Sequence, residues 1–365
     1  MNSMTQPVYR AAIVGVGRIG NSYDDQVVER QPPSYYQGEN RHTGLYVVLP
    51  INHAEAYQRT PGFALVAAAN RSQATLDTFG ERRGVKALYT DFRELLRMER
   101  PDIVSVCTQS PEKAEITIAA AAAGVKAIVV EKALATSMAE ADAMLTACEQ
   151  NGVLLAVNHP LRFSSLVRQS KALIDDGALG KLTGVTIHAG GGMLHIGTHI
   201  FDLMRYWAGD AVELYAQVPN YAPEQDLPAL GIVRFANGMT GLFDHTHGDQ
   251  QGFEVRGIDG CITISSMVGD GWLHRFEPTL PAAIKRQYPH RLISEPLVSP
   301  PHTLSPTQQL LTDLYASLNT GVPFISSGRD GAAALELGLA CYASHLAGKP
   351  VALPLSDRTL RVPNR

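Results

Sequence analysis

The sequence predicts a two-domain α/β protein: an N-terminal parallel sheet covered by helices, then an α+β domain with a large, mainly antiparallel open sheet. Three observations lead to this fold class. The chain has 365 residues, more than a single hydrophobic core usually holds. Over residues 1–159, short apolar runs alternate with helical stretches, as in parallel sheets. Over residues 160–365, β-rich runs and helices come in separate blocks.

The N-terminal domain, expected over residues 1–159, takes its strands from short runs rich in Val, Ile and Ala. We expect strands at 11–16, 64–69, 103–108, 127–132 and 154–159, and a weaker one at 86–90. Helices are expected at 91–99, 111–124 and 137–152. The last has apolar residues on one helical face and ends at Asn151-Gly152, a stop signal.

The C-terminal domain, expected over residues 160–365, begins with a helix at 164–177. Strand-like runs follow at 211–218, 230–238, 239–248, 253–260 and 261–269. The turn signals at 236–238 and 258–260 separate neighbouring runs, so we expect consecutive antiparallel strands. Two helices close the domain, at 306–321 and 330–348.

Composition excludes several classes of function. A net charge of −4, without any basic block, argues against a nucleic acid or an anionic membrane as partner. No run of about 18 apolar residues could span a bilayer, and the N-terminus lacks the apolar core of a signal peptide. The four cysteines are far apart without CxxC spacing, so neither a disulfide framework nor a zinc ribbon is indicated. We therefore expect a cytoplasmic protein.

A glycine-rich turn follows the first expected strand. Gly15, Gly17 and Gly20 have the G-x-G-x-x-G spacing, with Arg18 and Ile19 between the last two. The first glycine permits a tight turn, the second lets the backbone approach a pyrophosphate, and the third packs helix on strand. With a strand before it, a helix after it and five further β runs, this motif predicts a Rossmann dinucleotide-binding domain rather than a structural glycine turn.

The end of the second strand is where such domains distinguish NAD from NADP. An acidic residue that would accept from the ribose 2′-hydroxyl is absent there, and the strand runs into Asn70 and Arg71. Because Arg71 could pair with a 2′-phosphate, NADP is slightly favoured over NAD. The alternative is that Arg71 stacks on adenine and both cofactors bind.

This second strand lies unusually far from the glycines. We attribute the excess length to an insertion at about residues 22–50, between the glycine turn and the helical run HAEAYQRT. At the cofactor edge of the sheet it would be a lid, a subunit contact or a disordered surface loop.

Other candidate cofactor contacts follow later strands. Thr108 and Ser110 come at the end of the strand at 103–108, and Glu131 and Lys132 end the strand at 127–132. Ligands of open α/β sheets bind outside the carboxyl ends of the strands, so Lys132 should point at the nicotinamide.

At these residues the chain resembles the glucose–fructose oxidoreductase / inositol dehydrogenase / MocA family. The resemblance covers nearly the whole chain, through the motifs GVGRIG, AAGVKAIVVEKALATSMAEADAM, NHPLRF, GGGMLHIGTHIFDL and GKPVALPL. It implies NAD(P)-dependent oxidation or reduction of sugars, polyols and related hydroxy compounds. It also implies a homodimer or homotetramer formed through the C-terminal sheet.

The resemblance assigns roles to individual residues. Lys132 matches the lysine of the family's Glu-Lys-Pro motif, and Glu131 its neighbour near the nicotinamide ribose. Position 133 is Ala instead of Pro, which we expect to change the local turn more than the chemistry. His199 matches the catalytic histidine. Four residues earlier, where many members carry an aspartate, this chain has His195.

The histidine pair has three interpretations. His199 lies four residues after His195 and three before Asp202, so one helix face would carry all three. A metal site with His245 and His247 is conceivable, but Ile196 replaces the Glu of H-E-x-x-H, and we predict no metal. Two structural histidines at a helix start are a second alternative. Proton transfer in a nicotinamide enzyme is the interpretation we favour.

The resulting hypothesis is a dehydrogenase or reductase acting on a secondary alcohol of a small carbohydrate. His199 would take the hydroxyl proton, and Lys132 would polarise the oxygen and relay the proton. The other expected substrate contacts are Asn158, Arg162, His195 and Asp202, the last as a cap or orienting group for His199. One alternative is a glycosidase or lyase that oxidises a sugar transiently with tightly bound NAD(H). A less favoured one is a cofactor-binding regulator without catalysis.

Overall fold

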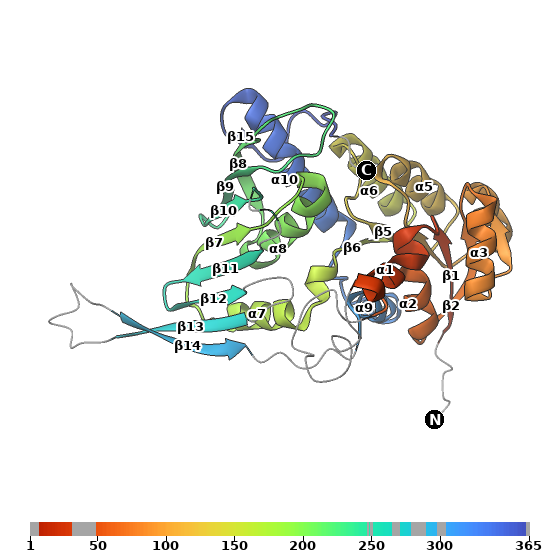
Figure 1. Ribbon diagram of the computed structural model, residues 1–365, viewed down its shortest axis with the longest axis horizontal. Coiled ribbons are helices and arrows are strands. Elements are labelled where there is room, and N and C mark those ends of the chain that lie inside the picture. Colours follow the sequence, from red (N-terminus) through yellow and green to blue (C-terminus); the bar gives the residue numbers. More distant parts are fainter. Residues whose placement is uncertain are drawn as a thin grey trace.

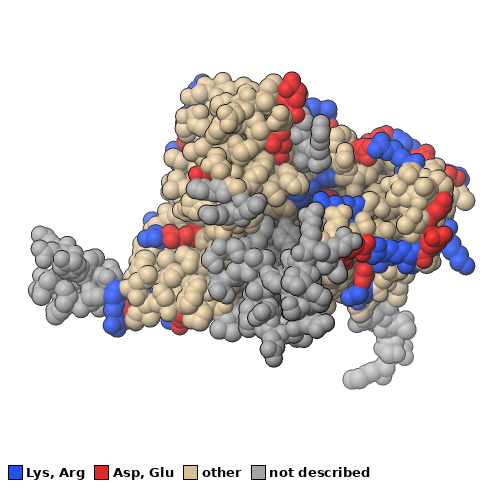
Figure 2. Space-filling model, viewed as in Figure 1, with Lys and Arg blue, Asp and Glu red and all other residues tan. Residues whose placement is uncertain are grey.

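The computed structural model describes residues 7–30, 49–246, 248, 251–264, 271–278, 290–297 and 304–362. Within these ranges the chain forms two sheets with helices packed on them (Figure 1). No helix of the described residues is long and apolar enough to cross a membrane. On the face drawn in Figure 2, the basic and acidic side chains of the described residues are interspersed.

Six parallel strands form the first sheet, in the order β3-β2-β1-β4-β5-β6. They are β1 (Tyr9–Val14), β2 (Phe63–Ala69), β3 (Ala87–Tyr89), β4 (Ile103–Val106), β5 (Ala127–Glu131) and β6 (Leu154–Asn158). All six expected strands are present, and their order confirms the Rossmann prediction. Because the strand order reverses between β1 and β4, a crevice opens at the carboxyl ends of these two strands.

Both faces of this sheet are buried. Its helices are α1 (Tyr23–Arg30), α2 (His53–Arg59), α3 (Gln73–Arg83), α4 (Phe92–Glu99), α5 (Ser110–Ala122) and α6 (Met138–Gln150). Side chains of β1 alternate between two cores: Ala12 and Val14 pack with α4, α5 and α6, whereas Ala11 and Ile13 pack with α2 and α3. Burial on both faces explains why these strands are continuous apolar runs.

Helix α9 (Pro306–Thr320), from near the C-terminus, also packs on the first sheet. Its Leu310, Leu311 and Leu314 belong to the same core cluster as α2 and α3. The division into domains at residue 159 stays a prediction, and this helix from beyond it completes one layer over the parallel sheet.

Nine strands form the second sheet, in the order β14-β13-β12-β11-β7-β10-β9-β8-β15. Only β7 and β10 pair in parallel; the other neighbours are antiparallel, which confirms the expected sheet. The strands are β7 (Leu182–His188), β8 (Ala211–Gln217), β9 (Leu230–Phe235), β10 (Thr240–Asp244), β11 (Gly252–Gly257), β12 (Gly260–Ile264), β13 (Gly271–Pro278), β14 (His290–Leu297) and β15 (Val351–Ala352).

Helices cover one face of the second sheet. These are α7 (Ser165–Asp175), α8 (Thr198–Ala208) and α10 (Gly328–Ala347) (Figure 1). Along β9 and β10 the side chains alternate: Val233 and Phe243 are buried beneath the helices, whereas Leu230, Ile232 and Leu242 are exposed on the other face. Among the described residues, this uncovered face thus carries exposed apolar side chains beside polar ones such as Arg234 and Thr240.

One local expectation needs correction. The helix expected from near His195 is divided into a π-helical turn, Met193–Gly197, and α8, so the three residues do not share the face of one regular helix. The insertion at about 22–50 stays a prediction; at its start, α1 occupies Tyr23–Arg30. Residues 31–48 of that segment lie outside the described part of the chain.

Candidate active site

One large pocket, of about 1240 Å³, lies at the carboxyl ends of the parallel strands. Its lining runs from the glycine turn after β1, past the ends of β4, β5 and β6, to the π-helical turn before α8. It therefore joins the two sheets. The lining includes these expected site residues: Gly15, Gly17, Arg18, Ile19, Asn70, Arg71, Thr108, Ser110, Glu131, Lys132, Asn158, His195 and His199.

The glycine turn has the geometry that a bound pyrophosphate requires. Gly15 has φ of +93°, and a Cβ there would lie 2.8 Å from the carbonyl carbon of Cys107. A Cβ on Gly20 would lie 2.2 Å from the carbonyl oxygen of Gly15, which explains the third glycine. At Gly17 a Cβ would meet nothing within 4 Å. This glycine lines the pocket, so its missing side chain leaves room for a ligand beside the backbone.

The two candidate cofactor residues at the end of β2, Asn70 and Arg71, both line the pocket. Asn70 follows the strand directly. The Arg71 guanidinium pairs with the carboxylate of Glu112 at 2.9 Å, and its side chain is 87% exposed. A second arginine nearby in the lining, Arg93, pairs with Glu115. The cationic groups at this end of the pocket thus already have acidic partners from α5.

Three polar atoms in the pocket lining are buried without a hydrogen-bond partner among the described residues. They are Thr108 Oγ1, Asn158 Oδ1 and His199 Nδ1. Buried polar atoms almost always have partners. These orphaned atoms indicate that a polar ligand belongs in the pocket.

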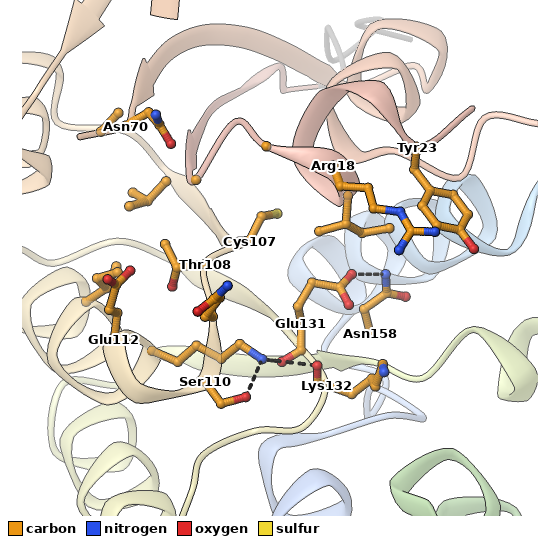
Figure 3. A pocket seen from close by; sticks show the side chains of 18 of the residues that line it. Arg18, Tyr23, Asn70, Cys107, Thr108, Ser110, Glu112, Glu131, Lys132 and Asn158 are labelled. Atoms are coloured by element: carbon orange, nitrogen blue, oxygen red, sulfur yellow. Dashed lines mark hydrogen bonds between the residues drawn. The ribbon is translucent and has the colours of Figure 1, made fainter. Parts of the chain in front are cut away.

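A buried ion pair lies at the end of β5. His53 Nε2 is 2.9 Å from Glu131 Oε1. The same oxygen also accepts from the Asn158 amide at 2.7 Å (Figure 3). His53 Nδ1 is 3.0 Å from the Ser105 hydroxyl. Burial alone would lower the pKa of His53, but its interactions with Cys107 and Glu131 raise that pKa to about 10. Burial would raise the pKa of Glu131, yet the hydrogen bond and charge of His53 keep it below its ordinary value.

Lys132, the next residue, links the two sheets. Its Nζ donates to the carbonyl of His195 at 2.7 Å, and the peptide bond after it, to Ala133, is cis. Burial lowers the pKa of Lys132, although the carboxylates of Glu131 and Asp226 oppose this. Asp226 in turn accepts from the backbone N–H of His195 at 2.8 Å, which fixes the π-helical turn.

Both histidines of the pair line the pocket, but in different environments. His195 is exposed, whereas His199 is buried at the start of α8. The charge of Lys132 and partial burial lower the pKa of His195. Burial, and then the charge of Lys132, hold the pKa of His199 well below its ordinary value. His199 is therefore a neutral imidazole at neutral pH.

Arg162 and Asp202 do not line the pocket, contrary to the expectation that they contact substrate. Asp202 is fully buried, and its Oδ2 accepts from Arg162 Nε at 2.7 Å. Arg162 also donates to the Asp330 carboxylate at 3.1 Å and to a backbone carbonyl. Asp202 lies 3.2 Å from the His159 ring, and that ring meets His199 edge-on. These residues form a buried network behind His199 and do not form a substrate-binding surface.

The metal interpretation of the histidines finds no support in the described residues. His245 follows β10 and is buried against the rings of Phe201 and Phe243, away from the pocket lining. His247 lies outside the described residues. In the part of the chain that the structure describes, no group of three or more His, Cys, Asp or Glu residues could hold a metal ion.

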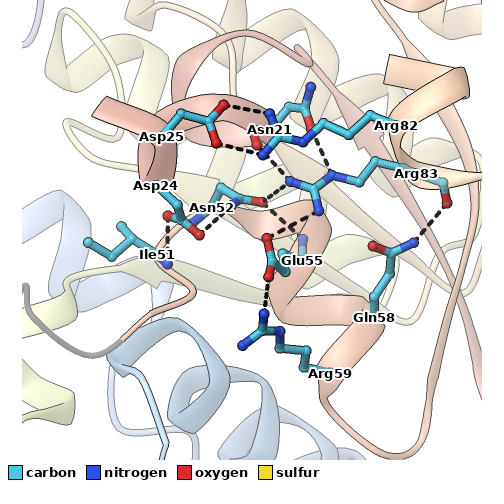
Figure 4. A network of polar contacts seen from close by, with 10 residues as sticks. All are labelled: Asn21, Asp24, Asp25, Ile51, Asn52, Glu55, Gln58, Arg59, Arg82 and Arg83. Carbon is cyan, nitrogen blue, oxygen red and sulfur yellow. Dashed lines mark hydrogen bonds and ion pairs between the residues drawn. The ribbon is translucent and has the colours of Figure 1, made fainter. Parts of the chain in front are cut away.

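Sequence reasoning missed several lining residues, which come from distant segments: Tyr23, Ile51, Lys113, Gln251 and Thr307. Asp24 brings two of these residues, Tyr23 and Ile51, to the same end of the pocket. Its carboxylate accepts from the backbone N–H groups of Ile51 and Asn52 and from the Asn52 side chain (Figure 4). The start of α1 is thereby fixed to the start of α2. No sequence signal joins these segments, since residues 31–48 separate them.

Comparison with known proteins now identifies the chain's relatives. The family model described as "Oxidoreductase family, NAD-binding Rossmann fold" matches residues 48–159, and the Gfo/Idh/MocA C-terminal domain matches residues 187–263. Together they span more than half of the chain. The chain belongs to the Gfo/Idh/MocA oxidoreductase family. This confirms the resemblance drawn from the sequence motifs.

Two curated relatives are D-apiose dehydrogenases. The enzyme of Paraburkholderia graminis is 27% identical over 243 residues, which covers 59% of this chain and 64% of that protein. The chain thus matches slightly less than two thirds of that relative's length. The enzyme of Rhizobium rhizogenes is 25% identical over 333 residues, covering 82% of this chain and 93% of that protein.

Among solved structures, levoglucosan dehydrogenase in complex with NADH and levoglucosan is similar to this chain. The TM-score is 0.73 at 19% identity, and the match covers 95% of this chain and 99% of that one. At this identity the likeness shows that the two proteins share a fold.

Proposed function

We propose that this protein transfers hydride between a nicotinamide cofactor and a secondary alcohol or ketone of a sugar, polyol or related carbohydrate. The observation that carries the proposal is the shared pocket: Lys132 and His199 line the same cavity as the glycine turn of the Rossmann fold. A dinucleotide on that turn would extend along the carboxyl ends of the strands toward these two residues.

The residues present fit a dinucleotide. Gly17 leaves backbone open to a pyrophosphate, the backbone of Arg18 and Ile19 begins the helical segment beside it, and Thr108 and Asn158 offer unpartnered polar atoms. When bound, the nicotinamide supplies the carbon that accepts or donates the hydride.

Protein groups then handle the proton. Because His199 is neutral, a ring nitrogen can accept the proton that the substrate hydroxyl loses. Lys132 donates one N–H to the carbonyl of His195, which leaves two of its three protons for the substrate oxygen. His195 and Asn158, at the same end of the pocket, would orient the remaining hydroxyls.

For the cofactor we propose NAD(H), a revision of the slight preference for NADP. The preference for NADP rests on Arg71 as a ligand for the 2′-phosphate. Glu112 now occupies that guanidinium at 2.9 Å, and its carboxylate would repel a phosphate placed there. The family's NAD-binding description supports the same choice.

The substrate class follows the relatives. Their names as dehydrogenases of D-apiose and levoglucosan support a small, neutral carbohydrate. The alternative of transient oxidation and elimination is not favoured, because these relatives are dehydrogenases. A regulator without catalysis would need neither Lys132 nor His199.

We further propose that the protein forms homodimers or homotetramers through the uncovered face of the second sheet. Exposed Leu230, Ile232 and Leu242 on that face support this, since contiguous apolar surface marks interaction sites. A cytoplasmic location is proposed because all four cysteines are free thiols, as is usual in reducing compartments.

The test is a nicotinamide absorbance assay on the purified protein. It is given NAD⁺ with D-apiose, levoglucosan and a panel of free sugars and polyols, and then NADH with the corresponding ketones. We expect NADH to form with at least one member of the panel, one ketone appearing per NADH. Binding of NADH without turnover on any member would contradict the proposal. In a parallel incubation with glycosides, release of free sugar without net NADH would favour the elimination cycle instead.

A further inference from the structure

Lys113 is a buried lysine that the catalytic proposal does not use. It lies in the first turn of α5, and only 2% of its surface is exposed. Neither feature favours a lysine, because burial disfavours its charge and a cation near a helix N-terminus opposes the helix dipole. Burial accordingly lowers the pKa of Lys113 to about 7, with the charge of Lys132 in the same direction and that of Glu131 opposing.

The contacts of Lys113 explain its presence. Its Nζ donates to three successive backbone carbonyls at the end of β5: Glu131 at 2.6 Å, Lys132 at 3.1 Å and Ala133 at 2.7 Å. The hydroxyl of Ser110, in the same turn of α5, lies 3.5 Å from Nζ (Figure 3). An ammonium group has three protons and no acceptor. Three carbonyls therefore match the protonated form, whereas a neutral amine would turn its lone pair toward one of them.

We propose that the protonated Lys113 is a positioning residue that holds the turn Glu131–Ala133, and thereby aims the side chain of Lys132 into the pocket. This inference rests on the proposed function, in which Lys132 contacts the substrate oxygen. The turn links β5 to α6, and its carbonyls point at the Lys113 ammonium. Without that ammonium, the backbone that carries Lys132 loses a donor shared by three consecutive residues.

The hydrogen bonds from Lys113 matter because Lys132 is held at both its backbone and its side chain. Its backbone carbonyl accepts from Lys113, while its Nζ donates to the carbonyl of His195. Displacement of a catalytic group by about 1 Å can lower turnover about 10²-fold. The charged or titratable groups that face Lys113 are Glu131 and Lys132 from the end of β5 and Cys107 from the end of β4.

The test compares Lys113→Met, which keeps the length and removes the donors, with Lys113→Arg, which keeps the charge. Thr117→Val is the control, because Thr117 is buried one turn further along α5 and lies outside the pocket lining. For Lys113→Met we expect kcat to fall about 10²-fold while the Kd for NADH changes little. Lys113→Arg should recover part of the loss, and Thr117→Val should match the wild type.

The pH dependence separates positioning from a structural role. Arg stays protonated, so the ratio of wild-type kcat to Lys113→Arg kcat should fall as pH rises through the pKa of Lys113. A constant ratio across neutral and mildly alkaline pH would overturn the role of the ammonium. Normal turnover in Lys113→Met, alongside an inactive Lys132→Met, would overturn the inference alone. Should Lys113→Met not fold, Lys113→Arg and its pH ratio still decide the matter. Normal turnover in Lys132→Met would overturn this inference together with the proposed function.

Discussion

The two ends of the pocket hold charge in opposite ways. At the end beside β2, Arg71 and Arg93 form exposed ion pairs with Glu112 and Glu115. At the end beside β5, the charges are buried and tied by short hydrogen bonds, as in the pair of Glu131 with His53. Exposed pairs are screened by water and contribute little, whereas buried ones shift pKa values and fix geometry. Chemistry is therefore expected at the buried end and cofactor choice at the exposed end.

The largest effect should come from the buried end. Lys132→Met removes the group that polarises the substrate oxygen, and we expect kcat to fall about 10²- to 10⁴-fold. The Kd for NADH, measured by its fluorescence, should stay nearly unchanged. Lys126→Met is the matched control, because Lys126 precedes the opposite end of β5 and its exposed side chain pairs with Asp102. Near-normal turnover of the Lys132→Met enzyme would contradict the assignment of the chemistry to the buried end of the pocket.

The network behind His199 should matter for stability. Asp202→Ala removes the fully buried carboxylate partner of Arg162 and leaves the partly buried Asp330, which we expect to cost about 3–5 kcal/mol of unfolding free energy. Asp210→Ala removes an exposed carboxylate from Arg205, which keeps Asp330 nearby, and should change stability little. Urea denaturation of both variants measures the difference. Equal losses in the two would show that burial does not set the value of these pairs.

The glycine turn, between the two ends, offers a matched pair of variants. A methyl group at position 20 would collide with the carbonyl oxygen of Gly15, so Gly20→Ala should lose about 1–3 kcal/mol of stability. At Gly17 the methyl group meets open space, so Gly17→Ala should keep its stability and bind NADH more weakly. Thermal unfolding and NADH titration of both variants check this. Unaltered NADH binding in Gly17→Ala would argue against a pyrophosphate on the turn.

The pH profile sharpens the account of the buried end. His199 must be neutral to accept a proton, and its pKa lies well below 6.5, so activity should persist as pH falls below 6.5. Lys132 must be protonated to donate, and its pKa is lowered from 10.5. As the pH is raised, activity should therefore decline before pH 10.5 is reached. The bell-shaped profile of kcat/KM is thus displaced to low pH relative to free side chains. An acid limb at or above pH 6.5 would contradict the burial argument for His199.

The smallest effect is expected at the exposed end. Glu112→Gln frees Arg71 and removes a negative charge, so NADPH should bind several-fold more tightly, on the order of 1 kcal/mol. Arg71→Ala should reverse this gain in the double variant. Salt should weaken both effects, because the pair is exposed. Titrations of NADH and NADPH measure them, and an unchanged preference in Glu112→Gln would mean that Glu112 does not set cofactor choice.

Much of the fold could be predicted from the sequence, because strands that are buried on both faces of a sheet appear in the sequence as continuous apolar runs. β4 and β5 are examples, with every residue buried. Elements without such a pattern were missed. β13 and β14 carry Arg275, Glu277, Arg291 and Glu295, which pair across the strands at the surface, and α3 buries only Leu76 and Phe79. Polar, paired edges give little signal in a single sequence.

The candidate site divides in the same way. Gly15, Gly17 and Gly20 could be found because a motif states their geometry, and Lys132 and His199 because they match a family pattern. His53 and Lys113 could not, since a lone histidine or lysine at a helix start is typically a solvated group and its burial depends on distant segments. Arg162 and Asp202 lie outside the pocket lining, because adjacency to a motif does not say which way a side chain points.

The most direct test of the central claim is a single-turnover measurement with enzyme-bound NAD⁺ and an active sugar from the panel above. We predict that the wild type forms one NADH per site. Lys132→Met and His199→Gln should bind NAD⁺ as the wild type does, yet form NADH at least about 10²-fold more slowly. Equal rates in all three proteins would contradict the account, because the proton would then be handled without the residues that meet at the buried end of the pocket.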